Sequence, residues 1–311
     1  MFIGVLVAPW IYQAIQRVPP CHVVALSKFI ASLQTMPFHR YVSRSVQVTA
    51  FVLLWPMIRW LGIAHLSELK LYKNTRALAD LLYGVVAALL PLWLLETVLV
   101  WKGWYLFNFT VTTALLLKLL STAAVVAVLE EFFFRGVLLG LSRRFLSARG
   151  AVVFSALLFA GVHFLSMPRA PMVTVHWWSG LALCAAVGQG VPELPLFLGA
   201  FSSLLVLGMI LAWVTVRTAS LWLAIGLHGA WIFGQQAFNH VAHYAITPPN
   251  ALLPWIGMPQ VYGMVPVGLL FFLPLAGTFV CLRPCLKERG YPFTGMSRVE
   301  VKNTNGRDAV G

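Results

Sequence analysis

Charged residues are scarce in this chain, and acidic residues are the scarcest of them. Asp and Glu together number nine among 311 residues, and charged residues of all kinds make up 10% of the sequence. Hydrophobic residues reach 60%, and the mean hydropathy of +0.84 lies far above that of soluble domains. This composition excludes a soluble globular protein.

Cysteine is also scarce, and its spacing provides neither a metal site nor a disulfide framework. The four cysteines, Cys21, Cys184, Cys281 and Cys285, include no CxxC pair. The last two lie near the end of an apolar run, where lipidation is possible, although inert small residues are the simpler interpretation. A cleavable signal peptide is not evident either, because the first apolar stretch lacks a basic segment before it and a small-residue cleavage site after it.

The surplus of basic over acidic residues gives a net charge of +13. The Lys and Arg residues lie between and after the apolar runs, which is typical of membrane-flanking charge. Arg143, Arg217 and Arg283 mark one side of the later spans, whereas the basic segment from Gln16 to Arg44 falls on the other side if the next run spans. We therefore expect an integral membrane protein with a lipid bilayer around it and no nucleic-acid partner.

Long apolar runs are abundant, and several reach the ~20 residues needed to cross ~30 Å of hydrocarbon. The predicted fold class is all-α, a polytopic transmembrane bundle of roughly eight membrane helices. The expected helices are Phe2–Ile15, Val46–Leu66, Ala77–Trp101, Phe107–Leu141, Ala151–Ser166, Leu194–Val216, Ser220–Phe238 and Gln260–Leu282. The piece between Met167 and Glu193 contains Pro and Trp, and it can be a loop, a re-entrant segment or a short helix.

Two of the rare acids stand side by side in the apolar stretch "VLEEFFFRGVLLG", followed by Arg135. A charge in hydrocarbon costs about 2.5–3.5 kcal/mol on insertion scales, so such residues usually line a polar interior or a working site. On a helix Glu131 and Arg135 are neighbours four residues apart, whereas Glu130 points about 100° away and has no cation at that spacing. The spacing predicts a Glu131–Arg135 pair and a separate Glu130. An ion pair that only helps two helices to pack is the alternative.

Two histidines lie on other apolar runs, His163 in "FAGVHF" and His228 in "LWLAIGLHGAWIF". A single membrane histidine is commonly a hydrogen-bonding residue between helices. Two histidines and a free glutamate on three separate spans can converge only inside a bundle, and that convergence suggests acid–base chemistry or a metal site. We interpret the remaining histidines as interfacial.

These segments resemble the CPBP family (CAAX protease and bacteriocin-processing enzymes), which contains type II CAAX prenyl endopeptidases. "EEFFFRG" matches the EExxxR motif of that family, "FAGVH" from Phe159 to His163 matches its FxxxH motif, and "TASLWLAIGLHGAW" is similar to the stretch that leads into its third motif. Three motifs in order, each on its own apolar run, are a specific signal. The resemblance covers about Leu115 to Phe238.

The resemblance implies a mechanism and a set of roles. Glu130 and His163 act as general base on water, and His228 donates to the oxyanion; Glu131 and Arg135 shape the site, and Phe159 belongs to the second motif. A polar residue usually follows the third-motif histidine by four positions, where this chain has Ile232. The family favours a glutamate-activated water without a metal or cofactor.

The resulting prediction is an intramembrane endopeptidase that cuts a membrane-associated protein or peptide, in a bacterial plasma membrane. The expected division of the chain is an N-terminal membrane region of uncertain topology (residues 1–76), a protease core (77–240), and a last membrane helix with a basic polar tail (241–311). A catalytically weakened pseudo-protease or membrane scaffold is the first alternative, because Ile232 cannot donate a hydrogen bond. A transporter that uses Glu130 and the histidines as a proton relay is the second, although no internal repeat is visible.

Overall fold

Helices make up nearly all the regular structure of the protein. The computed structural model describes residues 2–20, 22–63, 65–69, 71–108, 111–165, 174–186, 193–245, 255 and 269–288. Its α-helices are α1 (Phe2–Gln16), α2 (Val24–Gln34), α3 (Phe38–Trp60), α4 (Ala77–Trp101), α5 (Thr113–Glu131), α6 (Leu139–Phe145), α7 (Ala148–Val162), α8 (Ser179–Ala185), α9 (Leu194–Thr218), α10 (Trp222–Val241) and α12 (Phe272–Glu288). A π-helix, η2 (Phe132–Leu138), joins α5 to α6, and short 3-10 turns cover Leu66–Leu69 and Leu269–Phe271. The all-α fold class is confirmed.

Four helical stretches in the described part of the chain are long and apolar enough to cross a membrane. They are Ala77–Trp101, Thr113–Phe145, Leu194–Thr218 and Leu269–Lys287. Shorter apolar helices cover Phe2–Gln16, Val24–Gln34 and Ala148–Val162. This content fits a polytopic bundle.

Most of the predicted helices occur close to their expected bounds, and the differences have local causes. The helix expected from Phe107 begins at Thr113, because Tyr105–Phe107 forms strand β1, which pairs antiparallel with β2 (Ala242–Tyr244). Helix α3 begins at Phe38 instead of Val46, and α2 was not expected at all.

Two predicted segments are only partly described. The described part of the Met167–Glu193 piece contains a short helix, α8, and residues 167–173 and 187–192 lie outside the described residues. The start of the predicted Gln260–Leu282 helix lies outside them as well, and α12 follows from Phe272.

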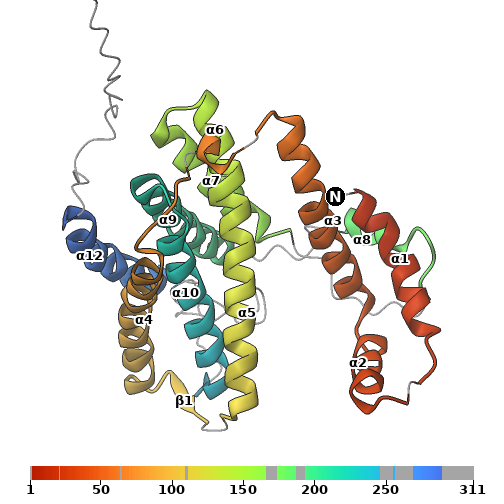
Figure 1. Ribbon diagram of the computed structural model, residues 1–311. Coiled ribbons are helices and arrows are strands. Elements are labelled where there is room, and N and C mark those ends of the chain that lie inside the picture. The colour runs from red at the N-terminus through yellow and green to blue at the C-terminus, as the bar shows by residue number, and fades with distance from the viewer. Residues whose placement is uncertain are drawn as a thin grey trace, which may run out of the picture.

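Helix α10 lies within the bundle, against α4 on one side and α5 on another (Figure 1). Glycines allow α4 and α10 to pack backbone to backbone: a Cβ on Gly84 would lie 2.6 Å from the Leu223 carbonyl oxygen, and one on Gly226 would overlap the Leu81 carbonyl. Small residues at helix contacts are the usual means of close packing in membranes. The two helices run parallel, so their first turns lie at the same end of the bundle. His228, in the second turn of α10, lies near that end.

The N-terminal helices α1, α2 and α3 form a separate group beside this bundle, with α8 against them (Figure 1). Their shared core contains Val5, Phe38, Tyr41 and Leu183. The far end of α3 reaches the bundle, where Leu54 and Ile58 cluster with Val137 of the π-helix.

Candidate active site

The first motif lies where helix α5 changes into a π-helix. Glu130 and Glu131 end the α-helical part, and Arg135 lies inside the π-helical turns. A π-helix leaves some backbone groups without their usual partner, and Ser155 of α7 donates its hydroxyl to the Phe134 carbonyl over 3.1 Å. Such π-helical turns are frequent at functional sites. Here the turn and its anchor tie the motif to α7, the helix that carries the second motif.

Glu131 and Arg135 form the ion pair that their spacing predicts. Arg135 Nη1 lies 2.8 Å from Glu131 Oε1, and both side chains are 0% exposed. The guanidinium also lies 4.2 Å from the Phe159 ring centroid, and its Nη2 donates to the Gly208 carbonyl of α9 over 3.4 Å. One buried cation thus connects α5, α7 and α9.

His228 bridges the two glutamates. Its Nδ1 lies 2.7 Å from Glu131 Oε1, and its Nε2 lies 3.8 Å from Glu130 Oε2. A carboxylate paired with Arg135 can only accept, so His228 Nδ1 carries a proton and donates it to Glu131. The Glu131–Arg135 pair therefore fixes the ring orientation and aims Nε2 towards Glu130. Sequence reasoning did not anticipate this contact.

His163 caps helix α7 and has its tautomer fixed as well. Its Nδ1 lies 2.7 Å from the Phe159 carbonyl oxygen. Because a carbonyl only accepts, Nδ1 carries the proton and the neutral ring has its lone pair on Nε2. Glu130, His228 and Arg135 are the charged or titratable side chains close enough to His163 to interact with it electrostatically.

Phe159 lies between the charged groups and both histidines. Its ring centroid is 4.6 Å from that of His163 and 5.7 Å from that of His228, and Arg135 stacks on it. The side chain is almost fully buried. The structure therefore brings all three motifs together around one aromatic ring.

Glu130 is the accessible acid of the site. Its side chain is 32% exposed, in contrast to the fully buried Glu131. The Oε2 atom of Glu130 is nevertheless buried and has no hydrogen-bond partner among the described residues, and the same holds for Glu131 Oε2 and Arg135 Nε. Buried polar atoms in this state are candidates for contacts with water or substrate. Chemically, the cluster offers a carboxylate, an imidazole acceptor and an oriented second imidazole.

Ile232 occupies the next turn of α10 and points into the contact with α5. It is 6% exposed and clusters with Ala123 and Ala127. Ala127 precedes Glu131 by one turn, so Ile232 fills the α5–α10 interface at least one turn of α5 away from the buried ion pair.

A metal centre requires several ligands within reach of one ion. Within the described ranges, no group of three His, Cys, Asp or Glu side chains is close enough to hold one. Within the predicted set of His163, His228 and Glu130, His228 Nε2 lies 3.8 Å from Glu130 Oε2.

The family comparison agrees with the motifs. Residues 112–234 match the family model described as type II CAAX prenyl endopeptidase Rce1-like. The matched region contains every residue of the site from Glu130 to Ile232, and residues 112–234 are thus an Rce1-like domain, which confirms the resemblance. Searches of curated proteins and of solved structures give no match. The family implies a CAAX-type intramembrane endopeptidase in general, and hence a membrane protease with a membrane-associated substrate.

Proposed function

We propose that this protein hydrolyses a peptide bond of a membrane-associated protein or peptide, with water activated by Glu130 and His163. The observation that carries the proposal is the approach of Glu130 to His228 within the Rce1-like domain, beside a second histidine whose Nδ1 is held by the Phe159 carbonyl. We place the protein in a bacterial plasma membrane, as the resemblance suggests.

The base is the pair of Glu130 and His163. A water held between the Glu130 carboxylate and His163 Nε2 gives up a proton as its oxygen attacks the substrate carbonyl. The same proton then passes to the leaving nitrogen, so one water is consumed for each bond that breaks. The exposed part of Glu130 admits water, and the buried remainder of the site limits how much enters.

His228 provides the donor for the oxyanion. Its Nδ1–H is already used by Glu131, so donation from Nε2 requires a second proton and a charged ring. Glu131 is balanced by Arg135, and a charged His228 in turn balances Glu130. A cationic donor directed at a developing alkoxide is a large source of rate enhancement.

The site lies close to one end of the bundle. His228 is six residues from Trp222, the first residue of α10, which corresponds to about 9 Å of helix. Arg217 precedes that end, at the side marked by basic residues. This depth favours cleavage near a membrane interface.

A pseudo-protease or scaffold remains the second candidate, and the packing of Ile232 favours it. An apolar side chain that fills the α5–α10 contact leaves the usual second donor position without a hydrogen bond. The protease would turn over a peptide substrate, whereas the pseudo-protease or scaffold would not. The test is purified protein in detergent, assayed by mass spectrometry against a library of membrane peptides, with the Glu130→Gln protein in parallel. Cleavage by the wild type alone supports the proposal, and identical product patterns from both proteins contradict it.

Replacement of Ile232 by Asn probes the missing donor. We expect Ile232→Asn to raise kcat by up to about 10²-fold, because one oxyanion donor is worth roughly 2.7–4 kcal/mol when well placed. We also expect a loss of about 1–3 kcal/mol in stability, because part of the amide is buried against Ala123 and Ala127. Turnover of one cleavable peptide and thermal unfolding in detergent measure the two effects.

The matched control is Ile232→Val, which removes one methylene and adds no donor. It should cost about 0.5–1.5 kcal/mol and leave kcat unchanged. An active wild type whose kcat does not respond to Asn would show that another group supplies the second donor.

Whether the protein holds and needs a metal ion can be measured directly. We expect no stoichiometric zinc in the purified protein and little effect of chelators, because the proposed chemistry needs only the carboxylate and the imidazoles. Elemental analysis together with turnover before and after chelation tests this. Zinc at one per chain, lost together with activity and restored with it, would overturn the water-activation scheme.

A further inference from the structure

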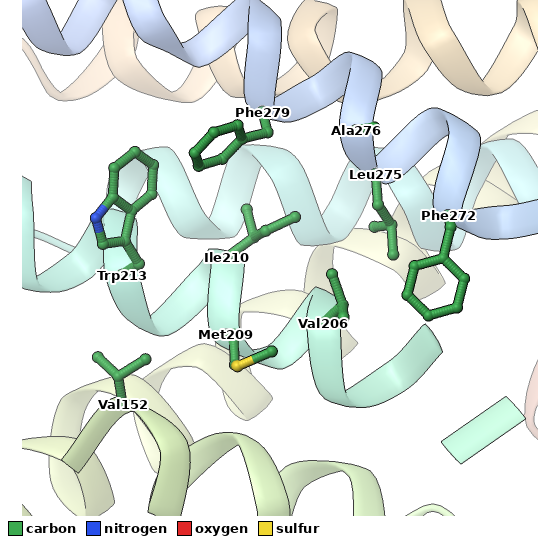
Figure 2. Close-up of a pocket in the computed structure, with 9 residues that line it drawn as sticks. All are labelled: Val152, Val206, Met209, Ile210, Trp213, Phe272, Leu275, Ala276 and Phe279. Carbon is green, nitrogen blue, oxygen red and sulfur yellow. The ribbon is translucent and has the colours of Figure 1, made fainter. Parts of the chain in front are cut away.

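A cavity lies between α7, α9 and α12, and none of the residues that line it belongs to the catalytic cluster. Its volume is about 470 Å³, within the range of small-molecule sites. The lining includes Val206, Met209 and Ile210 from α9, Leu275 and Ala276 from α12, and Val152 from α7 (Figure 2). Both α9 and the segment that contains α12 are long and apolar enough to cross a membrane, so the cavity lies between two candidate membrane helices.

The two ends of the cavity can be assigned along α9 and α12. The pairs Val206 with Phe272 and Trp213 with Phe279 mark its two ends, so α9 and α12 run parallel along it (Figure 2). Seven residues of helix separate the ends, which corresponds to about 10 Å. At one end the Trp213 and Phe279 rings pack with centroids 5.3 Å apart. A single extended hydrocarbon chain fits such a groove.

Positive charge is concentrated just beyond the aromatic pair. The Arg217 guanidinium lies 5.9 Å from the Trp213 ring, and that of Arg283 lies 5.5 Å from the Phe279 ring. Lys287 follows Arg283 by one turn on the same helix and is exposed. The arginines thus converge from two helices on the headgroup end of an apolar groove.

We propose that this groove binds an anionic phospholipid, with one acyl chain between α9 and α12 and the phosphate at Arg217 and Arg283. A guanidinium has five N–H donors in a planar fork and binds phosphate oxygens in pairs. The side marked by basic residues is the cytoplasmic side under the positive-inside rule, and that leaflet carries anionic lipid. The apolar lining and the two arginines match the acyl chain and the anionic phosphate of this one class of ligand.

The test is native mass spectrometry of delipidated full-length protein titrated with phosphatidylglycerol or with phosphatidylcholine of the same acyl chains. We expect one tightly bound phosphatidylglycerol per chain and much weaker phosphatidylcholine. The double variant Arg217→Gln/Arg283→Gln should lower phosphatidylglycerol affinity about 25-fold, since each basic side chain at a membrane surface contributes about fivefold. Ala276→Phe, which fills the groove, should abolish the tight binding of phosphatidylglycerol.

The control is Lys73→Gln/Arg76→Gln, which removes two exposed charges at the start of α4 and should leave lipid affinity unchanged. Thermal unfolding without added lipid shows whether each variant is folded. Equal affinity of the wild type for both lipids, or an equal loss in the control, would overturn the proposal. So would a dimer that Ala276→Phe dissociates and lipid leaves intact, because a second copy of the chain would then occupy the groove.

Discussion

Glu130→Gln should reduce turnover by about 10²–10⁴-fold, the usual contribution of a general base, and leave the protein folded. Glu130 is the exposed acid of the pair, and its contact with His228 is long at 3.8 Å. Its replacement by an isosteric amide therefore breaks no short hydrogen bond. The amide cannot take a proton from water, so the loss should appear in kcat. Steady-state kinetics on one cleavable peptide, with unfolding temperature measured in parallel, tests the expectation.

The matched control is Glu131→Gln, which changes the neighbouring carboxylate by the same atoms. Its loss of activity should come with a loss of stability, because Arg135 and His228 both depend on that carboxylate. A Glu130→Gln protein that retains activity, beside a stable Glu131→Gln protein that loses it, would reverse the two roles.

Sequence reasoning singled out these residues because charge in an apolar run is rare and its spacing is informative. The four-residue separation of Glu131 and Arg135 predicted their ion pair, which the structure has at 2.8 Å. The bounds of α4 were predicted without error, because a largely apolar run between Arg76 and Lys102 defines them. The all-α class followed from the length of the apolar runs.

Contacts between distant segments could not be predicted in this way. Nothing in the spacing of Glu131 and His228 links them across 97 residues, and the Gly208 carbonyl has no side-chain signature. The π-helix was also missed, because its sequence keeps the apolar character of the α-helix before it. Ile232 was singled out because it follows His228 by four residues, but only packing shows that it fills the contact with Ala123 and Ala127.

Sequence analysis did not single out Glu96, because this acidic residue has no charged neighbour at helical spacing. Glu96 lies within the apolar helix α4, is 8% exposed, and has an Oε1 atom without a hydrogen-bond partner among the described residues. The sequence offers no cation at helical spacing from it, so pattern reasoning has no pair to recognise. Glu96 belongs to none of the family motifs and takes part in none of the contacts described around Phe159.

Arg135→Ala should destabilise the protein by about 3–5 kcal/mol, because it leaves the Glu131 carboxylate buried without its cation. The change also removes the stacking on Phe159 and the contact with the Gly208 carbonyl. His228 loses its orientation indirectly, since Glu131 holds its Nδ1. Activity should therefore fall even under conditions in which the variant remains folded. Unfolding temperature in detergent and turnover below that temperature measure the two effects separately.

Removal of both charges separates stability from chemistry. A buried ion pair replaced by apolar residues of similar volume is often neutral or stabilising, so Glu131→Leu/Arg135→Met should recover most of the stability lost in Arg135→Ala. It should not recover turnover, because His228 Nδ1 then has no Glu131 carboxylate to hold it and fix the orientation of the ring. A double variant as active as the wild type would show that the pair serves packing alone. His228 would then be positioned by its other neighbours, among which the Phe159 ring is the closest aromatic contact, at 5.7 Å.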